Sequence, residues 1–565
     1  MSDVWKSEPE LLQSLDAAVP GILSSQKENG QFGVEPWIST DQNVLLALAA
    51  AWSIEGSHYY GDKAVLSAIV QGGHALIDAQ DADGMFTFRK KDHSTWGQIY
   101  MPWVYSRWIR AYWLTREAFG SEDRDRWDAA LTLGFDGISG TCLDRVHNVP
   151  THDCMGLYFA GLALDREDWM SQAVTFSHRV VDEQSEHGWW PEHKGPVVSY
   201  NFVYIDALGT LYTMCKDERL LDSLDRAARF HAAFAYPDGS MVETVDGRNW
   251  YHNTIRPGSP GFSHTPQGRG FLAQQHSRII ASAEDASRPF DADYAATMLL
   301  YAEEGELEPT AAASDEYVYR MGDLATVRRS RPWFICANAF RQDPHDNRWG
   351  QDWQNFLSVY HDRVGLILGG GNTKLQPLWS NFTVGDTSLM KHVPGDEEPA
   401  FLVAGVQHVP DKARTDLPDA DQEGAGASVE FQYGDVTATV SVRVIGTDQL
   451  GIVYEIDGTH GQAVAGHLTL LPRMGGLLKL STGDAIPIGD QPFSWTVPGQ
   501  AGFVEHNGWR LLLPGGVRVE WPAVPHNPYK KGGEGDSADG RIVGLIPFSP
   551  ERLKVEMVLQ VESNE

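Results

Sequence analysis

A short phrase that recurs five times in the first half of the chain constrains the fold more than any other feature. It consists of a polar or acidic residue, then Gly, a variable residue and usually an aromatic or bulky apolar residue. The glycines stand 54, 53, 51 and 51 residues apart. A period of roughly 50 residues fits one helical hairpin with its loops, and such repeats bury a core only by stacking on their neighbours. The five copies begin at Asn29, Asp83, Asp136, His187 and Asp238.

The glycine of each copy predicts a turn. Gly readily forms a helix C-cap or a turn with positive φ, so each copy is expected to mark the end of a helix. Three copies carry Gln four residues before the Gly, and three carry Glu shortly after it. These residues are Gln26, Gln80 and Gln184, and Glu35, Glu192 and Glu243. The repeat therefore predicts a ring of helix pairs.

Hydrophobic periodicity divides the chain into a helical half and a strand-rich half. Apolar residues recur at helical spacing in the first half, over residues 9–25, 41–55, 63–79, 101–119, 122–133, 153–163, 168–181, 201–214, 219–235, 267–283 and 291–303. From Tyr317 onward, short β-branched or alternating runs are bounded by Gly, Pro, Asn and Asp, over residues 325–328, 333–340, 356–360, 364–368, 429–433, 436–444 and 451–456. Segments 410–426 and 527–540 are expected to be exposed loops. We predict an (α/α) toroid of about five to six helix pairs over residues 1–312, followed by an antiparallel β-sandwich over residues 316–565.

Bulk composition limits the partners and the setting. A chain of 565 residues is too long for one ordinary core. Its net charge of −31 disfavours nucleic acid and anionic membranes as partners. The four cysteines form no CxxC pair, and the first residues show no secretory signal. We expect a cytoplasmic protein, and the oligomeric state is left open.

Polar side chains capable of catalysis gather in the loops that follow the Gly phrases. These loops lead into the inner helices of the expected ring, so they should converge at one end of it. His and Tyr are candidate acids and bases, while Arg and Asn can neutralise a carboxylate, and Trp can stack on sugar rings. The candidates are Arg89, Trp96, Asn148, His152, Trp189, Trp190, Glu192, His193, Tyr200, Tyr204, Arg248, Tyr251, His252 and Arg256.

These residue types suit β-elimination on a uronic acid sugar. The C5 proton becomes acidic enough only when the adjacent carboxylate is neutralised, and the leaving oxygen must then be protonated. Hydrolysis of a glycoside would instead require two carboxyl groups across the scissile bond. Four acidic residues keep that alternative open: Glu35, Asp41, Glu192 and Glu243. A protein that binds glycans without catalysis is the third possibility.

Other signatures are weaker. The chain has no nucleophile elbow, P-loop or dinucleotide fingerprint, and Gly369-Gly370-Gly371 is interpreted as a β-turn. No cofactor is expected, although a divalent metal remains open at His345, Asp346 and His361 or at His147 and His152. The Gln-x-x-x-Gly-x-(Phe/Trp) pattern is also similar to the repeat of triterpene cyclases, where it staples helices. The chain lacks their Asp-x-Asp-Asp acid motif.

Several segments together resemble the heparinase II/III-like and oligoalginate polysaccharide lyases. Thr151-His152-Asp153-Cys154 is similar to the family's histidine before an inner helix, and Gly188-Trp189-Trp190-Pro191-Glu192 with Ser199-Tyr200-Asn201 is similar to its tyrosine element. The stretch from His345-Asp346-Asn347 through residues 352–360 to Gly365-Leu366-Ile367-Leu368 resembles its histidine-bearing strand. The resemblance spans most of the chain and implies a helical toroid with a β-sandwich, acting on an oligosaccharide or polysaccharide.

The resemblance also implies roles for individual residues. Tyr200 is expected to act as base or acid at the sugar, with Tyr204 as its substitute one helical turn later. His152 is expected to be the partner acid or base, or the neutraliser of the carboxylate. Thr151 stands where the family often has Asn, and Asn148 or Arg248 could take its place. His345 is expected to act from the β-domain.

Overall fold

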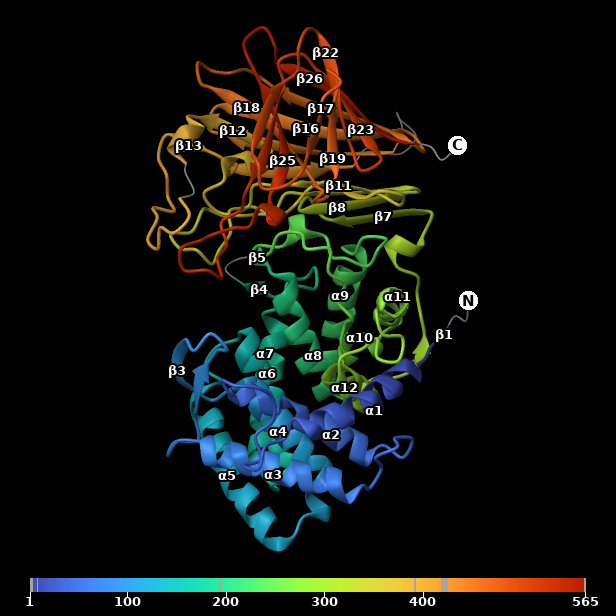
Figure 1. Ribbon diagram of the computed structural model, residues 1–565, viewed down its shortest axis with the longest axis vertical. Helices are drawn as coiled ribbons and strands as arrows, with labels where there is room; N and C mark the ends of the chain where they lie inside the picture. Colours follow the sequence, from blue (N-terminus) through green and yellow to red (C-terminus); the bar gives the residue numbers. More distant parts are fainter. Residues whose placement is uncertain (1–3, 8, 193–194, 391–392, 418–424, 563–565) are drawn as a thin grey trace. The chain divides into compact units, whose positions relative to one another are not determined.

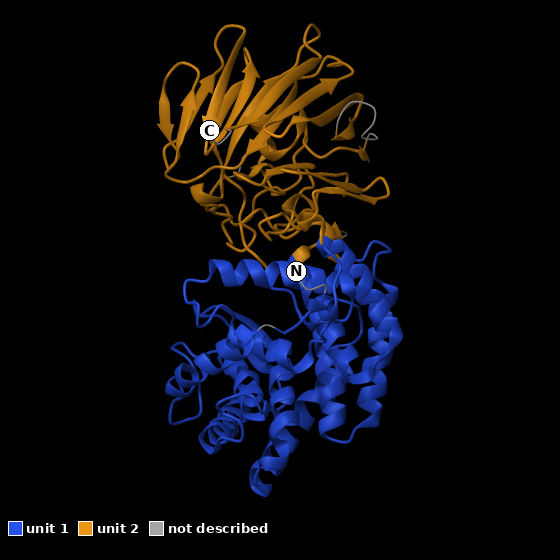
Figure 2. Cartoon of the chain, turned by 90° about the vertical axis from the view of Figure 1, so that its right-hand side faces the viewer, with its two compact units in different colours: residues 1–190, 199–232, 257–309 blue, residues 191–198, 233–256, 310–565 orange. Residues whose placement is uncertain are grey.

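The computed structural model describes residues 4–7, 9–192, 195–390, 393–417 and 425–562. The chain divides into two compact units (Figure 2). Unit 1 comprises residues 1–190, 199–232 and 257–309, and unit 2 comprises residues 191–198, 233–256 and 310–565. Two loops from the helical half therefore belong to unit 2.

Unit 1 is built from α-helices (Figure 1). Within its described residues these are α1 (Pro9–Ser24), α2 (Val44–Ser53), α3 (Lys63–Ala79), α4 (Pro102–Thr115), α5 (Ser121–Thr141), α6 (Asn148–Ala163), α7 (Glu167–Asp182), α8 (Val198–Cys215), α9 (Glu218–Ala233), α10 (Pro260–Ser263), α11 (Pro266–Ser282) and α12 (Ala292–Tyr301). A short hairpin of β2 (Phe86–Arg89) and β3 (Thr95–Ile99) precedes α4.

The helices form an inner and an outer layer, as the repeat predicts. Helices α2 and α6 are buried on almost every side, which is expected of inner helices, whereas α7 and α9 each have one apolar face. Helix α2 packs on α4, and α4 packs on α6. Helix α12 packs on both α1 and α2, and β1 (Val4–Trp5) pairs with β6 (Gly305–Glu306). The two ends of the helical region therefore meet, and the predicted toroid is confirmed.

Four of the five Gly phrases form the same turn. The Gly N–H donates to the carbonyl three residues earlier, and that earlier residue donates its N–H to the residue after the Gly, at 2.8–3.1 Å. The glycines have φ between 80° and 94°, a region that side chains other than Gly rarely adopt. They are Gly30, Gly84, Gly188 and Gly239. Each turn follows an outer helix, α1, α3, α7 or α9.

The three glutamines of the phrase staple successive outer helices. Gln26 Nε2 donates to the Ala68 carbonyl of α3 at 2.8 Å. Gln80 and Gln184 repeat the contact on α5 and α9, at 3.1 Å and 3.0 Å. The glutamine therefore ties the end of one outer helix to the backbone of the next.

The third phrase does not form a turn, so the predicted end of the helix at 133 is wrong. Gly137 lies inside α5, which continues to Thr141. A Cβ at Gly137 would lie 2.1 Å from the Tyr100 ring, and one at Gly134 would lie 2.2 Å from the Tyr105 ring. These glycines make room for aromatic rings beside α5.

The start of one helix and the presence of one short helix also differ from the prediction. Helix α6 begins at Asn148, five residues before the expected 153, because Pro150 is tolerated in a first helical turn, where its missing N–H has no partner to lose. The single turn α10 was not predicted, since four residues are too few to show periodicity.

Unit 2 is a sandwich of two antiparallel sheets, as predicted. One sheet has the order β21-β24-β25-β18-β11-β10-β9-β8-β7, with β12 and β13 attached at β18. The other has the order β14-β15-β16-β17-β26-β23-β22-β19-β20. Aromatic rings fill the space between them: Phe356 and Phe431 lie 5.0 Å apart, and Phe382 and Tyr454 lie 5.1 Å apart.

The strands of unit 2 include counterparts of all seven predicted segments, and the other strands were not predicted individually. Their bounds are β7 (Glu316–Met321), β8 (Ala325–Ser330), β9 (Trp333–Asn338), β10 (Leu357–His361), β11 (Gly365–Leu368), β12 (Phe382–Gly385), β13 (Val406–Gln407), β14 (Lys412–Asp416), β15 (Gly426–Tyr433), β16 (Val436–Gly446), β17 (Gln449–Ile456), β18 (Val464–Leu470), β19 (Leu477–Leu480), β20 (Ala485–Pro487), β21 (Phe493–Thr496), β22 (Ala501–His506), β23 (Trp509–Pro514), β24 (Arg518–Ala523), β25 (Arg541–Pro547) and β26 (Lys554–Val561). Strand β14 corrects the expected loop at 410–426, of which residues 418–424 lie outside the described part. It is a polar edge strand, and edge strands commonly carry charges that make them resemble loops.

The three consecutive glycines after β11 hold a loop of the helical half against the sandwich. Gly369, Gly370 and Gly371 all have positive φ. The Gly370 N–H donates to Glu243 Oε1 at 2.7 Å, and a Cβ at Gly371 would lie 2.9 Å from the Trp250 Cα. The segment is thus a close-packing surface for loop 233–256 rather than a simple β-turn.

Candidate active site

Local interactions fix the points at which the inner helices begin. Pro102 opens α4, where its fixed φ suits a first helical position. At the start of α6, Thr151 Oγ1 donates to the His147 carbonyl at 2.7 Å. At the start of α8, the Asn201 side chain accepts the Trp190 N–H at 3.0 Å. The predicted catalytic residues of unit 1 lie in the N-terminal halves of α6 and α8, whose first turns are held by these side-chain hydrogen bonds.

His152 is almost completely buried between α4 and α6. Its Nε2 lies 2.8 Å from Ser106 Oγ, and its ring packs 4.6 Å from the Trp103 ring. Burial, reinforced by the charges of Arg107 and Arg110, lowers the pKa of His152 well below its ordinary value. The imidazole is neutral at neutral pH. It can exchange a proton or a hydrogen bond, but it supplies no positive charge to offset a carboxylate.

Two arginines of α4 hold the inner layer around this histidine. Arg107 binds Asp293 of α12 through two parallel hydrogen bonds, Nε to Oδ1 at 2.9 Å and Nη2 to Oδ2 at 2.6 Å. Arg110 donates to the Ser106 carbonyl at 2.9 Å and lies over the Tyr301 ring. A forked arginine–carboxylate pair fixes geometry as well as charge. It positions α4, and with it the serine hydroxyl that contacts the buried imidazole.

The two tyrosines of α8 differ in accessibility. Tyr204 is 1% exposed, and its ring stacks on Trp190 at 4.8 Å with an interplanar angle of 3°. Trp190 is itself buried and donates its indole N–H to the Val180 carbonyl at 2.8 Å. Tyr200, in the first turn of α8, is only half-buried, as is Trp189. Packing therefore accounts for Tyr204 and Trp190, whereas Tyr200 retains access to solvent.

The remaining predicted residues of unit 1 lie in the first turn of α6 and on the hairpin before α4. Asn148 is buried in the first turn of α6. Arg89 is exposed on the β2–β3 hairpin, and Trp96 on the same hairpin is 53% exposed, with the Lys90 ammonium 4.6 Å from its ring. Lys91 fastens the hairpin to the loop before α2 by an ion pair with Asp41 at 2.6 Å. Trp96 is thus an exposed aromatic surface on an anchored hairpin.

Loop 233–256 carries four of the predicted residues into unit 2. Arg248 and Arg256 are half-buried, and His252 is exposed, with Nδ1 3.8 Å from Asp539 Oδ1. Tyr251 donates its hydroxyl to Asn253 Oδ1 at 3.1 Å, and burial raises its pKa. Tyr251 and His252 line a polar cavity of about 480 Å³ together with Asp238, Asn253, Arg473, Asn507, Asp539 and Arg541.

His345 lies in a loop of unit 2 that a buried ion pair supports. Its Nε2 is 3.2 Å from Gln342 Oε1, and its carbonyl accepts from Lys374 Nζ at 2.7 Å. Lys374 is fully buried and pairs with Asp352 at 2.6 Å, and His408 Nε2 lies 2.8 Å from the other oxygen of Asp352. Although burial acts to raise it, His408 and Lys374 hold the pKa of Asp352 below its ordinary value.

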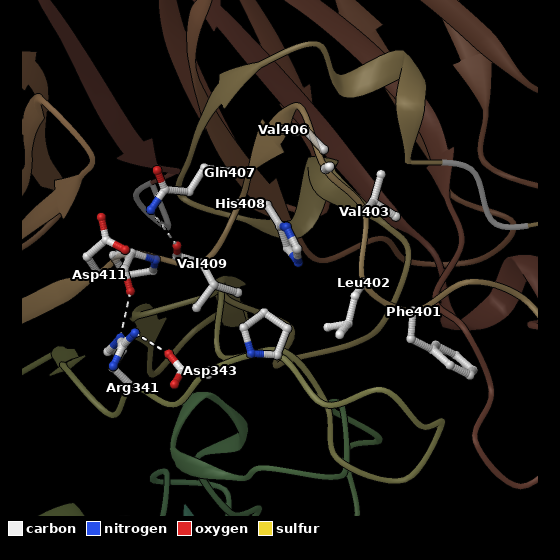
Figure 3. A pocket seen from close by; sticks show the side chains of 13 residues that line it. Arg341, Asp343, Phe401, Leu402, Val403, Val406, Gln407, His408, Val409 and Asp411 are labelled. Carbon is white, nitrogen blue, oxygen red and sulfur yellow. Dashed lines mark hydrogen bonds and ion pairs between the residues drawn. The ribbon is translucent and has the colours of Figure 1, made fainter.

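His408 also reaches a neighbouring cavity of about 400 Å³ (Figure 3). Its lining is mainly apolar and includes Phe401, Leu402 and Val409. Arg341 at the rim donates to the Pro410 carbonyl at 2.9 Å and pairs with Asp343. His345 itself is not among the lining residues.

The four carboxylates of the hydrolase alternative each lie in a different environment, with the following contacts and burial. Glu35 is exposed, and a hydrogen bond from Lys27 lowers its pKa. Asp41 pairs with Lys91, and both residues belong to unit 1. In unit 2, Glu192 is buried, and Glu243 accepts the Tyr236 hydroxyl at 2.8 Å in addition to the Gly370 N–H. A general acid in a glycosidase needs a raised pKa, which Glu35 lacks.

The remaining observations concern His193, metal binding and membrane-spanning helices. His193 lies outside the described residues. Over the described segments, no group of three or more His, Cys, Asp and Glu side chains is arranged to hold a metal ion. No helix within those segments is long and apolar enough to cross a membrane.

Comparison with solved structures identifies the fold. A chondroitinase AC lyase has a TM-score of 0.55 at 12% sequence identity, with 98% of this chain and 82% of that chain covered. A Paenibacillus xanthan lyase has a TM-score of 0.54 at 12% identity. The alignment covers 99% of this chain and 58% of the xanthan lyase. A heparinase III has a TM-score of 0.51 at 11% identity, with 98% and 84% covered. No protein-family model and no curated protein matches the sequence. The chain thus has the helical-toroid and β-sandwich fold seen in these polysaccharide lyases, as its sequence motifs predict.

Proposed function

We propose that this protein is a polysaccharide lyase that cleaves uronic-acid-containing oligosaccharides or polysaccharides by β-elimination. One observation carries the proposal: the similarity to chondroitinase AC lyase extends over 98% of the chain, through both the helical and the sandwich regions. Because the sequences are only 12% identical, the chemistry has to be argued from the residues of this chain.

In unit 1, Tyr200 is the proposed base that removes the C5 proton, and its protonated form then returns a proton to the leaving oxygen. Its half-buried place in the first turn of α8 supports this choice over the buried Tyr204. His152 is the proposed partner in proton exchange. Its neutral state suits acceptance of a hydrogen bond, so neutralising the carboxylate is assigned to other groups, of which Asn148 is the candidate in unit 1.

In unit 2, the proposed roles concern substrate binding. Arg248 is the candidate reader of the carboxylate, since its planar fork can bond both oxygens. Arg256, Tyr251, His252 and Glu192 remain proposed binding residues, and His345 a proposed catalytic one. In unit 1, Trp96, Arg89 and Trp189 are proposed to contact sugar rings. Trp190 is proposed to support them from the core, since it is fully buried.

The experiment is incubation with a panel of chondroitin, heparan sulfate and xanthan while ultraviolet absorbance and reducing ends are recorded together. Elimination creates a conjugated C4=C5 double bond, so absorbance and reducing ends should rise in parallel. New reducing ends without absorbance would favour the hydrolase alternative. Binding without either signal would favour a glycan-binding protein.

A further inference from the structure

Three loops of unit 2 bring an arginine and two aromatic rings together. The Arg248 guanidinium carbon lies 5.0 Å from the Trp349 ring centroid and 5.4 Å from that of Tyr529. The two rings lie 6.3 Å apart, at 68°. A second guanidinium, that of Arg348, lies 4.4 Å from the same Trp349 ring. We name Arg248, Arg348, Trp349 and Tyr529 the arginine–aromatic cluster.

Each of the three loops is fixed in the same way. An Asp or Asn side chain accepts the backbone N–H of the residue two positions later, a turn that Asx residues favour. The pairs are Asp246 with Arg248 at 2.8 Å, Asn347 with Trp349 at 2.9 Å, and Asn527 with Tyr529 at 3.0 Å. The backbone under each side chain of the cluster is therefore set before a ligand arrives.

Hydrogen bonds also join the loops to one another. The Gln351 N–H donates to the Gly247 carbonyl at 3.1 Å. The Tyr529 hydroxyl donates to Asn249 Oδ1 at 3.0 Å. The cluster is thus one connected surface assembled from segments about 100 and 180 residues apart, and such preorganisation lowers the cost of binding.

The charges in the cluster favour an anionic ligand. Two guanidinium groups approach one indole, and among the described residues no ion pair joins Arg348 to a carboxylate. The nearby acid, Asp246, is buried, and its two oxygens accept backbone N–H groups of Arg248, Asn249 and Val198. On a chain of net charge −31, this is a local excess of positive charge.

The rings supply the other half of a sugar-binding surface. Tyr529 is 54% exposed and Trp349 is half-buried, so part of each ring faces solvent. Aromatic rings stack on the apolar faces of pyranoses, and a guanidinium beside them can hold a carboxylate or sulfate through two hydrogen bonds.

We propose that the arginine–aromatic cluster is an anionic-sugar subsite, in which Trp349 and Tyr529 support one sugar ring and Arg348, with Arg248, binds its carboxylate or sulfate. The inference rests on the proposed function for the identity of the glycan, but the binding itself can be measured without turnover. Arg348, Trp349 and Tyr529 then determine which acidic sugars the protein accepts.

The test is calorimetric titration of the full chain with chondroitin sulfate oligosaccharides. Arg348→Gln removes a charge-assisted contact and Trp349→Leu removes a stacking surface, and each should weaken binding about tenfold. Arg510→Gln is the matched control, because Arg510 also lies over a ring of unit 2, 4.6 Å from Phe503. It should bind within about twofold of the wild type.

Two chemically altered ligands identify the anionic group. If wild type and Arg348→Gln bind desulfated oligosaccharides equally well, the arginine binds sulfate. If they bind carboxyl-reduced oligosaccharides equally well, the arginine binds the uronate carboxylate. If Trp349→Leu fails to fold, as judged by its circular dichroism, Arg348→Gln decides alone.

Wild-type affinity in Arg348→Gln, or no binding of any acidic oligosaccharide to the wild type, would overturn the inference. If the variants bind more weakly but the wild type cleaves no glycan, the subsite is upheld and the proposed lyase activity is refuted.

Discussion

At the level of single side chains, the proposed proton chemistry of unit 1 depends on which groups are neutral and which can be reached. His152 is neutral because it is buried, and its Nε2 is engaged by the Ser106 hydroxyl. Tyr200 is half-buried in the first turn of α8, the next inner helix after α6, while Tyr204 is packed against Trp190. Of these two tyrosines, Tyr200 is therefore the one whose side chain is accessible to solvent without displacing core residues.

Tyr200→Phe should therefore lower kcat by about 100-fold or more, the usual scale for an acid–base group. The change removes one hydroxyl and keeps the packing of the half-buried ring, so the protein should still fold, with a melting temperature lowered by a few degrees at most. Tyr204→Phe is the control on the same helix and should keep activity within a few-fold. Loss of activity in Tyr204→Phe, with near-full activity in Tyr200→Phe, would reverse the assignment.

A second histidine of unit 1 makes stability depend on pH. His276 is fully buried, its Nε2 lies 2.6 Å from the Tyr294 hydroxyl, and burial lowers its pKa to about 3. In the unfolded chain its pKa is about 6.5. Between these values the unfolded chain binds a proton that the folded chain does not, so the free energy of unfolding falls as pH falls through this window.

Comparing urea unfolding at pH 7 and pH 5 measures this effect. His276→Gln removes one titrating group, so its loss of stability over the interval should be about 2 kcal/mol smaller than that of the wild type. Equal losses in the two proteins would show that His276 takes up its proton in the folded state.

At the level of elements, the glycine turns show how close approach and backbone conformation act together. Gly188 has a φ of 94°, and a Cβ there would lie 2.0 Å from the Arg226 carbonyl oxygen of α9. Gly140, in α5, has open space where a Cβ would stand.

Gly188→Ala should reduce the free energy of unfolding by roughly 2–4 kcal/mol, because it combines an unfavourable φ with a clash. Gly140→Ala should be neutral or stabilise by about 0.5–1 kcal/mol through helix propensity. Chemical denaturation of both variants checks the pair, and similar values for the two would mean that the turn is not under steric constraint.

The loop that carries His345 depends on a buried charge pair. Lys374→Met leaves the Asp352 carboxylate buried with only His408 as partner, and should cost about 3–5 kcal/mol of stability. Adding Asp352→Asn to Lys374→Met removes the uncompensated charge and should recover part of the loss. If the double variant is less stable than Lys374→Met alone, the charge is not what destabilises the single variant.

Features with a local cause were predictable from the sequence. Helical periodicity predicted every described helix of unit 1 except the single turn α10, strand periodicity predicted seven strands of unit 2, and four glycine turns follow from the need for positive φ. Gly137 was misread because a glycine that makes room for the Tyr100 ring looks the same in sequence as one that makes a turn. Strand β14 was missed because its polar residues suit both an edge strand and a loop.

At the level of the whole molecule, the parts that escaped prediction are those assembled from distant segments. Loops 191–198 and 233–256 belong to unit 2 although helices of unit 1 flank them, and no periodicity signals that exchange. Trp349 and Tyr529 join Arg248 across long stretches of chain, so neither stood out in the sequence. The positions of the candidate residues on the inner helices were predictable, because the repeat shows which loops lead into those helices. The difference in burial between Tyr200 and Tyr204 was not predictable from the sequence.

The central claim is that this protein breaks glycosidic bonds by elimination, and the mass of its products tests it most directly. Digestion of a uronate-containing glycan in water labelled with heavy oxygen, followed by mass spectrometry, distinguishes the two ways of cleaving the bond. Elimination adds no water, so we predict unsaturated fragments whose newly formed ends carry no label from the solvent at early times. Fragments heavier by one water that carry the heavy oxygen would contradict the account and identify a hydrolase.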